Sequence, residues 1–102
     1  MNRGEVWWVG SKQGARRPFL ILTRQVAIPL LHSVLAVPAT RTVRDIPTEV
    51  QLDRADGMPD ACALSLDNLT LVPKEYFIEP ICTLEPERLK AVCVALAEAT
   101  DC

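Results

Sequence analysis

The sequence has a single histidine, His32, and none of its four cysteines are arranged as a CxxC pair. Structural zinc sites usually need clusters of these two residue types at short spacing, so no zinc site or other metal site is expected. The scattered cysteines are typical of reduced thiols in a cytoplasmic protein. Phosphate-binding glycine loops and nucleophile elbows are also missing, and nothing in the sequence suggests a cofactor.

Long hydrophobic runs are absent as well. The longest, residues 18–22 and 26–31, are far too short to span a bilayer, and residues 1–15 contain no apolar signal core. We therefore expect neither membrane association nor secretion. The 102 residues fit one domain, residues 1–102. A domain of this size buries only about two-thirds of the surface of its unfolded chain, so pairing with a second copy would stabilise it.

The charge is distributed unevenly along a chain whose net charge is only −2. Residues 1–48 contain seven basic and two acidic side chains, a formal charge of +5, whereas the remainder contains four basic and eleven acidic side chains, or −7. A basic half indicates an anionic partner, of which nucleic acid is the most obvious class. An ordinary solvated surface would give the same count, so charge alone is a weak indication.

The hydrophobic pattern predicts a mainly antiparallel β (α+β) domain, in the form of a small barrel or a strongly curved sheet. Apolar or alternating segments of strand length recur along the chain, and Pro29 argues against a long helix at 25–32. Polar, basic loops are expected at 10–17 and 40–45. The expected strands are 5–9, 18–24, 33–40, 48–52, 61–66 and 68–72, with a strand pair, or a strand and a turn, within 74–84.

Only the end of the chain has a helical pattern. Glu85 followed by Pro86 is a typical helix start, because proline is favoured at the first helical position. The apolar residues that follow have the spacing of one helical face. They are Leu89, Val92, Cys93 and Leu96.

The two basic loops contain the residue types best suited to a phosphate. Arginine offers a planar pair of donors to phosphate oxygens, and threonine offers a short hydroxyl. A solvated arginine and a turn-forming threonine are ordinary alternatives for any single position. Trp7 and Trp8 should point to opposite faces of their strand, one into the core and the other toward a stacked base or a dimer contact.

Five motifs, in this order, resemble the MazF/PemK family of toxin ribonucleases from bacterial toxin–antitoxin systems: MNRGEVWWV, GSKQGARRPFLILTR, VLAVPATRT, IPTEVQL and LDNLTLVP. The resemblance covers the whole chain. It implies a small SH3-like, PemK-like barrel, a homodimer and a cognate antitoxin. It also implies metal-independent, sequence-selective cleavage of single-stranded RNA, in which a ribose 2′-hydroxyl attacks the adjacent phosphorus. The products would carry a 2′,3′-cyclic phosphate and a 5′-hydroxyl.

The same resemblance assigns the site residues. Arg17 and Thr40 match the family's catalytic arginine and threonine. Lys12 stands where some members have a glutamate proposed as the base, so the base of this protein is unassigned. Asp67 and Asn68 suit base recognition and a turn cap equally well. The residues expected to bind RNA are Ser11, Lys12, Gln13, Arg16, Thr42, Asp67 and Asn68.

Two other function classes stay open on the sequence. One is a CcdB-like toxin that binds gyrase without cutting nucleic acid, and the other is a non-catalytic nucleic-acid-binding regulator. The pair of Arg17 and Thr40 favours RNA cleavage. Lys12 differs from the glutamate of some family members, so the two non-cleaving alternatives are retained.

Overall fold

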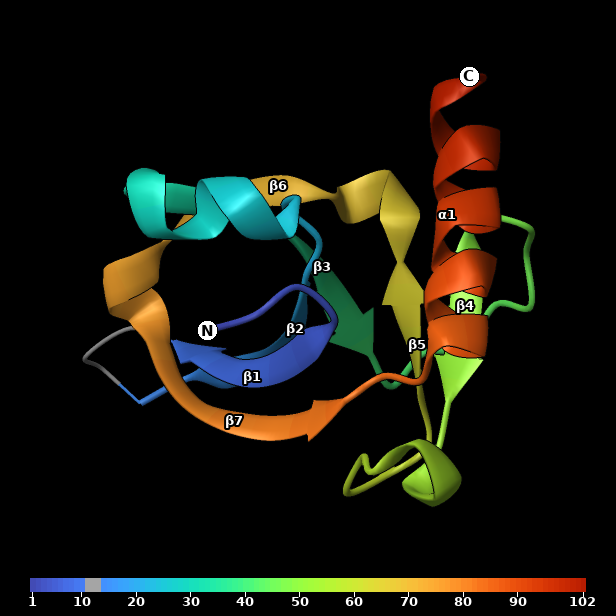
Figure 1. The fold of residues 1–102 in the computed structure, drawn as a ribbon. Coiled ribbons are helices and arrows are strands. Elements are labelled where there is room, and N and C mark those ends of the chain that lie inside the picture. Colours follow the sequence, from blue (N-terminus) through green and yellow to red (C-terminus); the bar gives the residue numbers. More distant parts are fainter. Residues whose placement is uncertain (11–13) are drawn as a thin grey trace.

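The computed structural model describes residues 1–10 and 14–102, which form a seven-stranded antiparallel sheet and a C-terminal helix (Figure 1). This confirms the predicted mainly β class. The strands are β1 (Glu5–Gly10), β2 (Arg16–Ile21), β3 (Ser33–Thr40), β4 (Glu49–Leu52), β5 (Cys62–Ser65), β6 (Thr70–Pro73) and β7 (Phe77–Thr83). The helix is α1 (Pro86–Thr100), and short 3-10 segments are η1 (Gln25–Leu30), η2 (Arg54–Asp56), η3 (Leu66–Asn68) and η4 (Lys74–Tyr76).

The sheet is strongly curved but open. Its strand order is β4-β5-β3-β2-β1-β7, and the long strand β3 pairs with β6 at its start, β2 in its middle and β5 at its end. β7 curves beneath β1 and β2 (Figure 1). Among the described residues, no ladder joins β7 to β4, so of the two predicted forms the structure has the strongly curved sheet and not the closed barrel.

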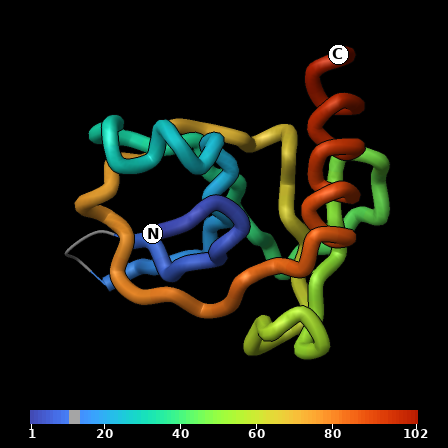
Figure 2. Tube along the Cα trace, in the orientation of Figure 1, coloured from blue at the N-terminus to red at the C-terminus, as the bar shows by residue number. Residues whose placement is uncertain are grey.

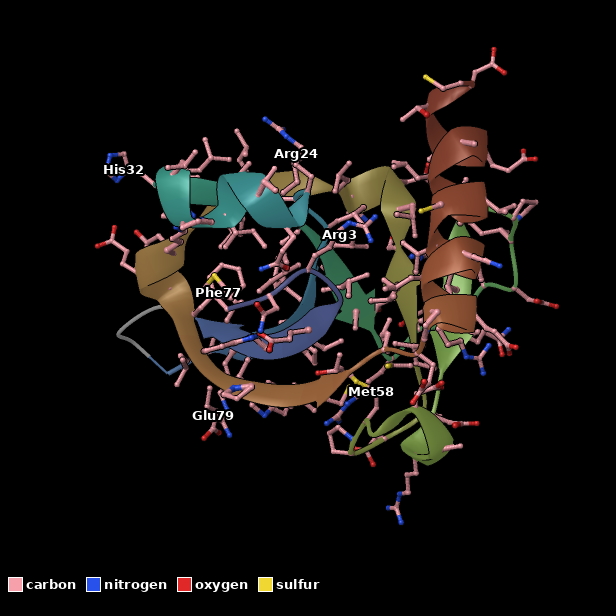
Figure 3. All side chains as sticks on the ribbon, viewed as in Figure 1. Arg3, Arg24, His32, Met58, Phe77 and Glu79 are labelled. Atoms are coloured by element: carbon pink, nitrogen blue, oxygen red, sulfur yellow. The ribbon has the colours of Figure 1, made fainter. Side chains whose placement is uncertain are left out.

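A register shift between β1 and β7 sorts side chains onto two faces. Val9 lies opposite Phe77, and its neighbour Trp8 lies opposite Glu79, so β7 has one extra residue at this point. Such a bulge turns Phe77 and Glu79 to opposite faces of the sheet. Figure 3 shows Phe77 inside the curve of β7 and Glu79 outside it.

The two faces bury different clusters. The main core, which includes Val6, Leu20 and Val92, lies between the sheet and α1. A smaller cluster of Ile21, Ile28 and Val34 lies on the opposite side, where Trp7 packs against it. The two tryptophans therefore face opposite ways, as predicted. The chain trace in Figure 2 shows the N-terminus within the curve of the sheet and the C-terminus at the far end of the helix.

Helix α1 begins at Pro86 with Glu85 as its N-cap, as predicted. Val92 is fully buried, but the expectation that Cys93 shares the buried face is wrong. The thiol of Cys93 is exposed at the edge of the face and lies 3.9 Å from the Arg3 guanidinium. The fully packed residues of the helix are Val92 and Ala95, and Leu89 and Leu96 are partly buried beside them.

The predicted loop 10–17 ends earlier than expected, because β2 begins at Arg16. Gly10 pairs with Arg16 and Val9 with Arg17. The prediction ended the loop where apolar residues begin, yet ladder hydrogen bonds use the backbone and continue under polar side chains. A side chain at Gly10 would approach the Ala15 carbonyl oxygen to 2.6 Å, so the turn closes only with glycine there.

No helix in the described part of the chain has the length and apolar character needed to traverse a bilayer.

Candidate functional site

A pocket of about 350 Å³ opens between the start of β2, the end of β3 and the turn that leads into β5. Its size falls in the range of pockets that hold small molecules. Polar and cationic side chains predominate on the strand side, and the turn contributes apolar groups and the carboxylate of Asp60. The lining residues are Trp8, Arg16, Arg17, Pro18, Ala39, Thr40, Arg41, Thr42, Met58, Pro59, Asp60, Ala61 and Cys62.

The pocket brings together Arg17 and Thr40, the two residues that the resemblance assigns as catalytic. β2 and β3 are antiparallel, with Phe19 opposite Pro38. Continuing this register by two residues places Arg17 across from Thr40, at the point where the two strands part. The pairing of the two strands therefore sets the spacing of the two side chains.

The three arginines in the pocket differ in their partners. Arg16 forms an ion pair of 3.2 Å with Glu79, and Arg41 one of 3.8 Å with Asp60. Across residues 1–10 and 14–102, no acidic side chain pairs with Arg17, which is exposed. Arg17 is thus the guanidinium available for an anionic ligand.

The Thr40 hydroxyl is oriented by its own turn. The Thr42 backbone N–H donates a hydrogen bond of 3.2 Å to Thr40 Oγ1. This bond occupies one lone pair of the hydroxyl oxygen and leaves its proton free to donate. Thr42 therefore contributes to the site through its backbone as well as lining the pocket.

Trp8 forms part of the pocket wall beside Arg16. The Arg16 guanidinium carbon lies 4.7 Å from the centre of the indole ring, the geometry of a cation–π contact. The sequence left two roles open for the second tryptophan, stacking on a base or a dimer contact. The position of Trp8 in the pocket wall suits contact with a ligand.

The opposite wall is a turn held by side-chain hydrogen bonds. Asp53 and Asp56 form a reciprocal capping box around η2, and Arg88 of α1 donates to Asp56 Oδ1 at 2.9 Å. Partial burial opposes ionisation of Asp56, but the Asp53 N–H and the Arg88 guanidinium outweigh it and hold the pKa of this carboxyl below its ordinary value. The helix thereby anchors the turn that ends at the pocket.

The turn also contributes pocket residues that were not predicted from the sequence. They are Met58, Cys62 and Asp60, the ion-pair partner of Arg41. Cys62 is no nucleophile candidate, because burial and the nearby Asp56 and Asp60 carboxylates raise the pKa of its thiol. The thiol is therefore protonated at neutral pH. The acidic and apolar residues of this turn carry no motif, so only the path of the turn reveals them.

Two predicted RNA-binding residues lie outside the pocket. Asp67 Oδ2 accepts a hydrogen bond of 2.6 Å from Thr48, and Asn68 Nδ2 donates one of 2.8 Å to Ser65. The first bond ties the turn between β5 and β6 to the residue before β4, and the second lies within that turn. Contact with RNA stays a prediction for both residues. Three further predicted residues, Ser11, Lys12 and Gln13, lie outside the described part of the chain.

The fold and the pocket define a small antiparallel β protein whose pocket is lined by three arginines. Residues 2–100 match the family model described as PemK-like, MazF-like toxin of type II toxin–antitoxin system. The chain belongs to this family, which confirms the resemblance found in the motifs.

Relatives and solved structures agree with this assignment. The chain is 38% identical over 101 residues to the probable endoribonuclease MazF5 of Mycobacterium tuberculosis H37Rv, covering 98% of this chain and 93% of the relative. It is 34% identical over 103 residues to the probable endoribonuclease MazF2 of the same organism, over the full length of both. The solved structure of the Mycobacterium tuberculosis toxin MazF-mt6 superposes with a TM-score of 0.86 at 32% identity, covering 95% of this chain and 96% of that one. A mycobacterial endoribonuclease in complex with its cognate antitoxin gives a TM-score of 0.88 at 26% identity, covering 99% and 95%.

Proposed function

We propose that this MazF-family toxin is a metal-independent endoribonuclease that cleaves single-stranded RNA in the pocket between Arg17 and Thr40. The proposal depends on two residues that line the same pocket. Arg17 has no acidic partner among the described residues, and the hydroxyl of Thr40 is free to donate a hydrogen bond. Both groups suit a phosphodiester, and both come from strand ends that the sheet holds in place.

The proposed step is a transesterification within the RNA. The 2′-oxygen loses its proton and bonds to phosphorus, the bond from phosphorus to the 5′-oxygen breaks, and the leaving oxygen takes up a proton. The products are a 2′,3′-cyclic phosphate and a 5′-hydroxyl. Arg17 neutralises the extra negative charge on the pentacoordinate phosphorus and donates toward the leaving oxygen. Thr40 donates to a non-bridging oxygen.

Arginine is protonated at any ordinary pH, so Arg17 is not the base. Lys12 replaces the carboxylate that some family members carry, and removal of the 2′-proton is proposed not to depend on this position. Asp60 is the one carboxylate among the described residues that line the pocket, and it is engaged by Arg41. A water or an RNA phosphate oxygen can also accept the proton.

The protein is proposed to act as a homodimer. Leu35 of β3 and Leu71 of β6 lie directly opposite each other and are 41% and 63% exposed. Val26 and Leu30, on the η1 segment that leads into β3, are more exposed still. Burying these side chains against a second copy would enlarge a core that is small for a free-standing domain.

A cognate antitoxin is the second proposed partner, and the proposed location is the cytoplasm. The similar mycobacterial structure described above is a complex with an antitoxin. Here an acidic or apolar antitoxin segment would fit over the pocket, because its strand side carries Arg16, Arg17 and Arg41. The gyrase-binding and non-catalytic alternatives are not favoured, since relatives matched over the full chain are named probable endoribonucleases.

Cleavage of a mixed RNA pool tests the proposal. The purified protein is incubated with the pool in EDTA, and the new 5′ ends are sequenced with and without prior phosphorylation by a kinase. We expect 5′-hydroxyl ends at a short recurring sequence. Fragments with 5′-phosphates, or cleavage only after magnesium is added, would contradict the proposal.

A further inference from the structure

Three side chains form a row across β2, β1 and β7 at the edge of the pocket. Trp8 lies directly opposite Glu79 of β7, and Arg16 is its diagonal neighbour on β2, because Arg16 pairs with Gly10. The Arg16 guanidinium lies over the indole ring at 4.7 Å, and its Nη1 lies 3.2 Å from Glu79 Oε1. The bulge in β7 makes this row possible, since it turns Glu79 to the face of Trp8.

The contacts that hold Arg16 over the indole are weak ones. The side chains of Arg16 and Glu79 are 46% and 55% exposed. An exposed ion pair and an exposed cation–π contact each contribute little, whereas stacking of a nucleobase on an aromatic ring contributes more per base. A nucleobase can therefore replace Arg16 on the indole ring of Trp8 without a net loss of interaction free energy.

Trp7 offers no such surface. Its ring packs edge to face against Phe77, with centroids 6.1 Å apart, and its indole N–H donates to Glu5 Oε1 at 2.9 Å. Trp8 instead lines the same pocket as Arg17 and Thr40. A base stacked on Trp8 would thus belong to a nucleotide beside the phosphate held by those two residues.

We propose that Trp8 is the stacking platform for the nucleobase next to the scissile phosphate, and that Arg16 occupies this platform when no RNA is bound. Glu79 holds Arg16 in that place. When a base stacks on the indole, Arg16 leaves the ring and Glu79, and its guanidinium adds positive charge beside the RNA backbone near Arg17. This inference rests on the proposed ribonuclease function and assigns the residue that receives a base.

A double-mutant cycle between protein and RNA tests the platform. The probe is a short RNA that spans the cleaved sequence, blocked by 2′-O-methylation at the scissile nucleotide, together with versions that lack one base at a time. For the wild type we expect loss of one base beside the cut to weaken binding by about 5- to 150-fold, the contribution of one stacked base. In Trp8→Leu the intact and abasic RNAs should bind equally, and Trp8→Phe should keep part of the difference.

A purely structural Trp8 gives a different result. In that case Trp8→Leu weakens the binding of every probe to the same extent, and the penalty for the missing base persists, which overturns the platform. The wild-type protein could cleave the RNA pool while no base contributes to binding in a way that depends on Trp8. That result would contradict this inference alone. Failure to cleave the pool contradicts the proposed function.

The displacement of Arg16 has its own measurement. In a Trp7→Phe background, Trp8 is the only tryptophan, and its emission should change on binding the intact probe but not the abasic one. Glu79→Gln should tighten binding by up to about fivefold, because it releases Arg16 from an exposed ion pair. The matched control Glu75→Gln, an exposed acid in η4, should change nothing. Weaker binding by Glu79→Gln would overturn the role of Glu79 as the holder of Arg16.

Discussion

The backbone N–H of Thr42 donates to Thr40 Oγ1 across 3.2 Å, so the catalytic candidate Thr40 is oriented by the chain two residues beyond it. Removing the hydroxyl by Thr40→Ala should lower the cleavage rate at saturating RNA by roughly ten- to a thousandfold, as loss of a transition-state donor does. Thr40→Ser keeps the hydroxyl and should stay within about tenfold of the wild type. Equal losses in the two variants would contradict a role for the hydroxyl.

Arg17→Ala should abolish detectable cleavage and leave the melting temperature nearly unchanged, because Arg17 is exposed and forms no ion pair with a described residue. The matched control is Arg24→Ala, an exposed arginine at the start of η1. Figure 3 shows Arg24 beside η1 in the upper part of the view and the pocket residue Met58 in the lower part. Gel assays of both variants on the same RNA check the prediction, and normal activity in Arg17→Ala would remove Arg17 from the site.

Lys12 is expected to act through its charge and not as a base. Lys12→Ala should weaken RNA binding and reduce the salt dependence of binding by about one phosphate contact, and Lys12→Glu should not raise the rate. Lys90→Ala, at an exposed position on α1, is the control for a simple change of net charge. Affinities measured over a series of salt concentrations give the slope.

The rival is Lys12 as the base, with its pKa lowered by the neighbouring Arg16 and Arg17. Collapse of the saturated rate in Lys12→Ala, with loss of one limb of the pH–rate profile, would establish that rival. Asp60→Asn in the same assay tests the carboxylate that lines the pocket. A collapse confined to Asp60→Asn would instead assign proton removal to Asp60.

The Asp56–Arg88 pair should make stability depend on pH in the acid range. The pKa of Asp56 is lower in the folded protein than its ordinary value, so its stabilisation is present at neutral pH and is lost as the pH falls through that lower pKa. Arg88→Met should therefore lower the urea midpoint at pH 7, and its difference from the wild type should shrink toward pH 3. Lys90→Met on the same helix should show no such trend.

The exposed leucine pair predicts the oligomeric state. Leu71→Arg places a charge on the face that Leu35 and Leu71 share and should convert a homodimer to a monomer at micromolar concentration. Light scattering measures the change, and Ile78→Arg, an exposed position on β7, is the control. A wild-type monomer at that concentration would refute the dimer. A Leu71→Arg protein that stays dimeric would place the interface elsewhere.

The resemblance names Arg17 and Thr40, and the pairing of neighbouring strands accounts for their lying together. The patterns of β2 and β3 are clear, and adjacent antiparallel strands bring Arg17 and Thr40 to the same end. The partners of the other arginines could not be predicted in this way. Glu79 faces Trp8 only because β7 carries an extra residue, and a bulge leaves no mark in the hydrophobic pattern.

Residues 53–60 are rich in turn-forming residue types, but the position of this turn at the pocket could not be predicted, for a different reason. Its path depends on Arg88, a residue 32 positions beyond Asp56, with which it pairs. Contacts of that separation are set by tertiary packing and have no local signature. The exposed Cys93 has the same origin, because the choice between neighbouring positions on a helix face is made by the surface against which the helix packs.

The two walls of the pocket differ in how freely they can change over generations. The wall of Arg17 and Thr40 is part of the strand ladder, where an altered backbone would disturb the whole sheet. The opposite wall is a turn tied to the helix by side-chain bonds, so its exposed residues 59–61 can be exchanged while those ties remain, whereas Met58 and Cys62 belong to the core. After gene duplication, copies of such a toxin can thus diverge along this turn while the strand ends that carry Arg17 and Thr40 stay the same.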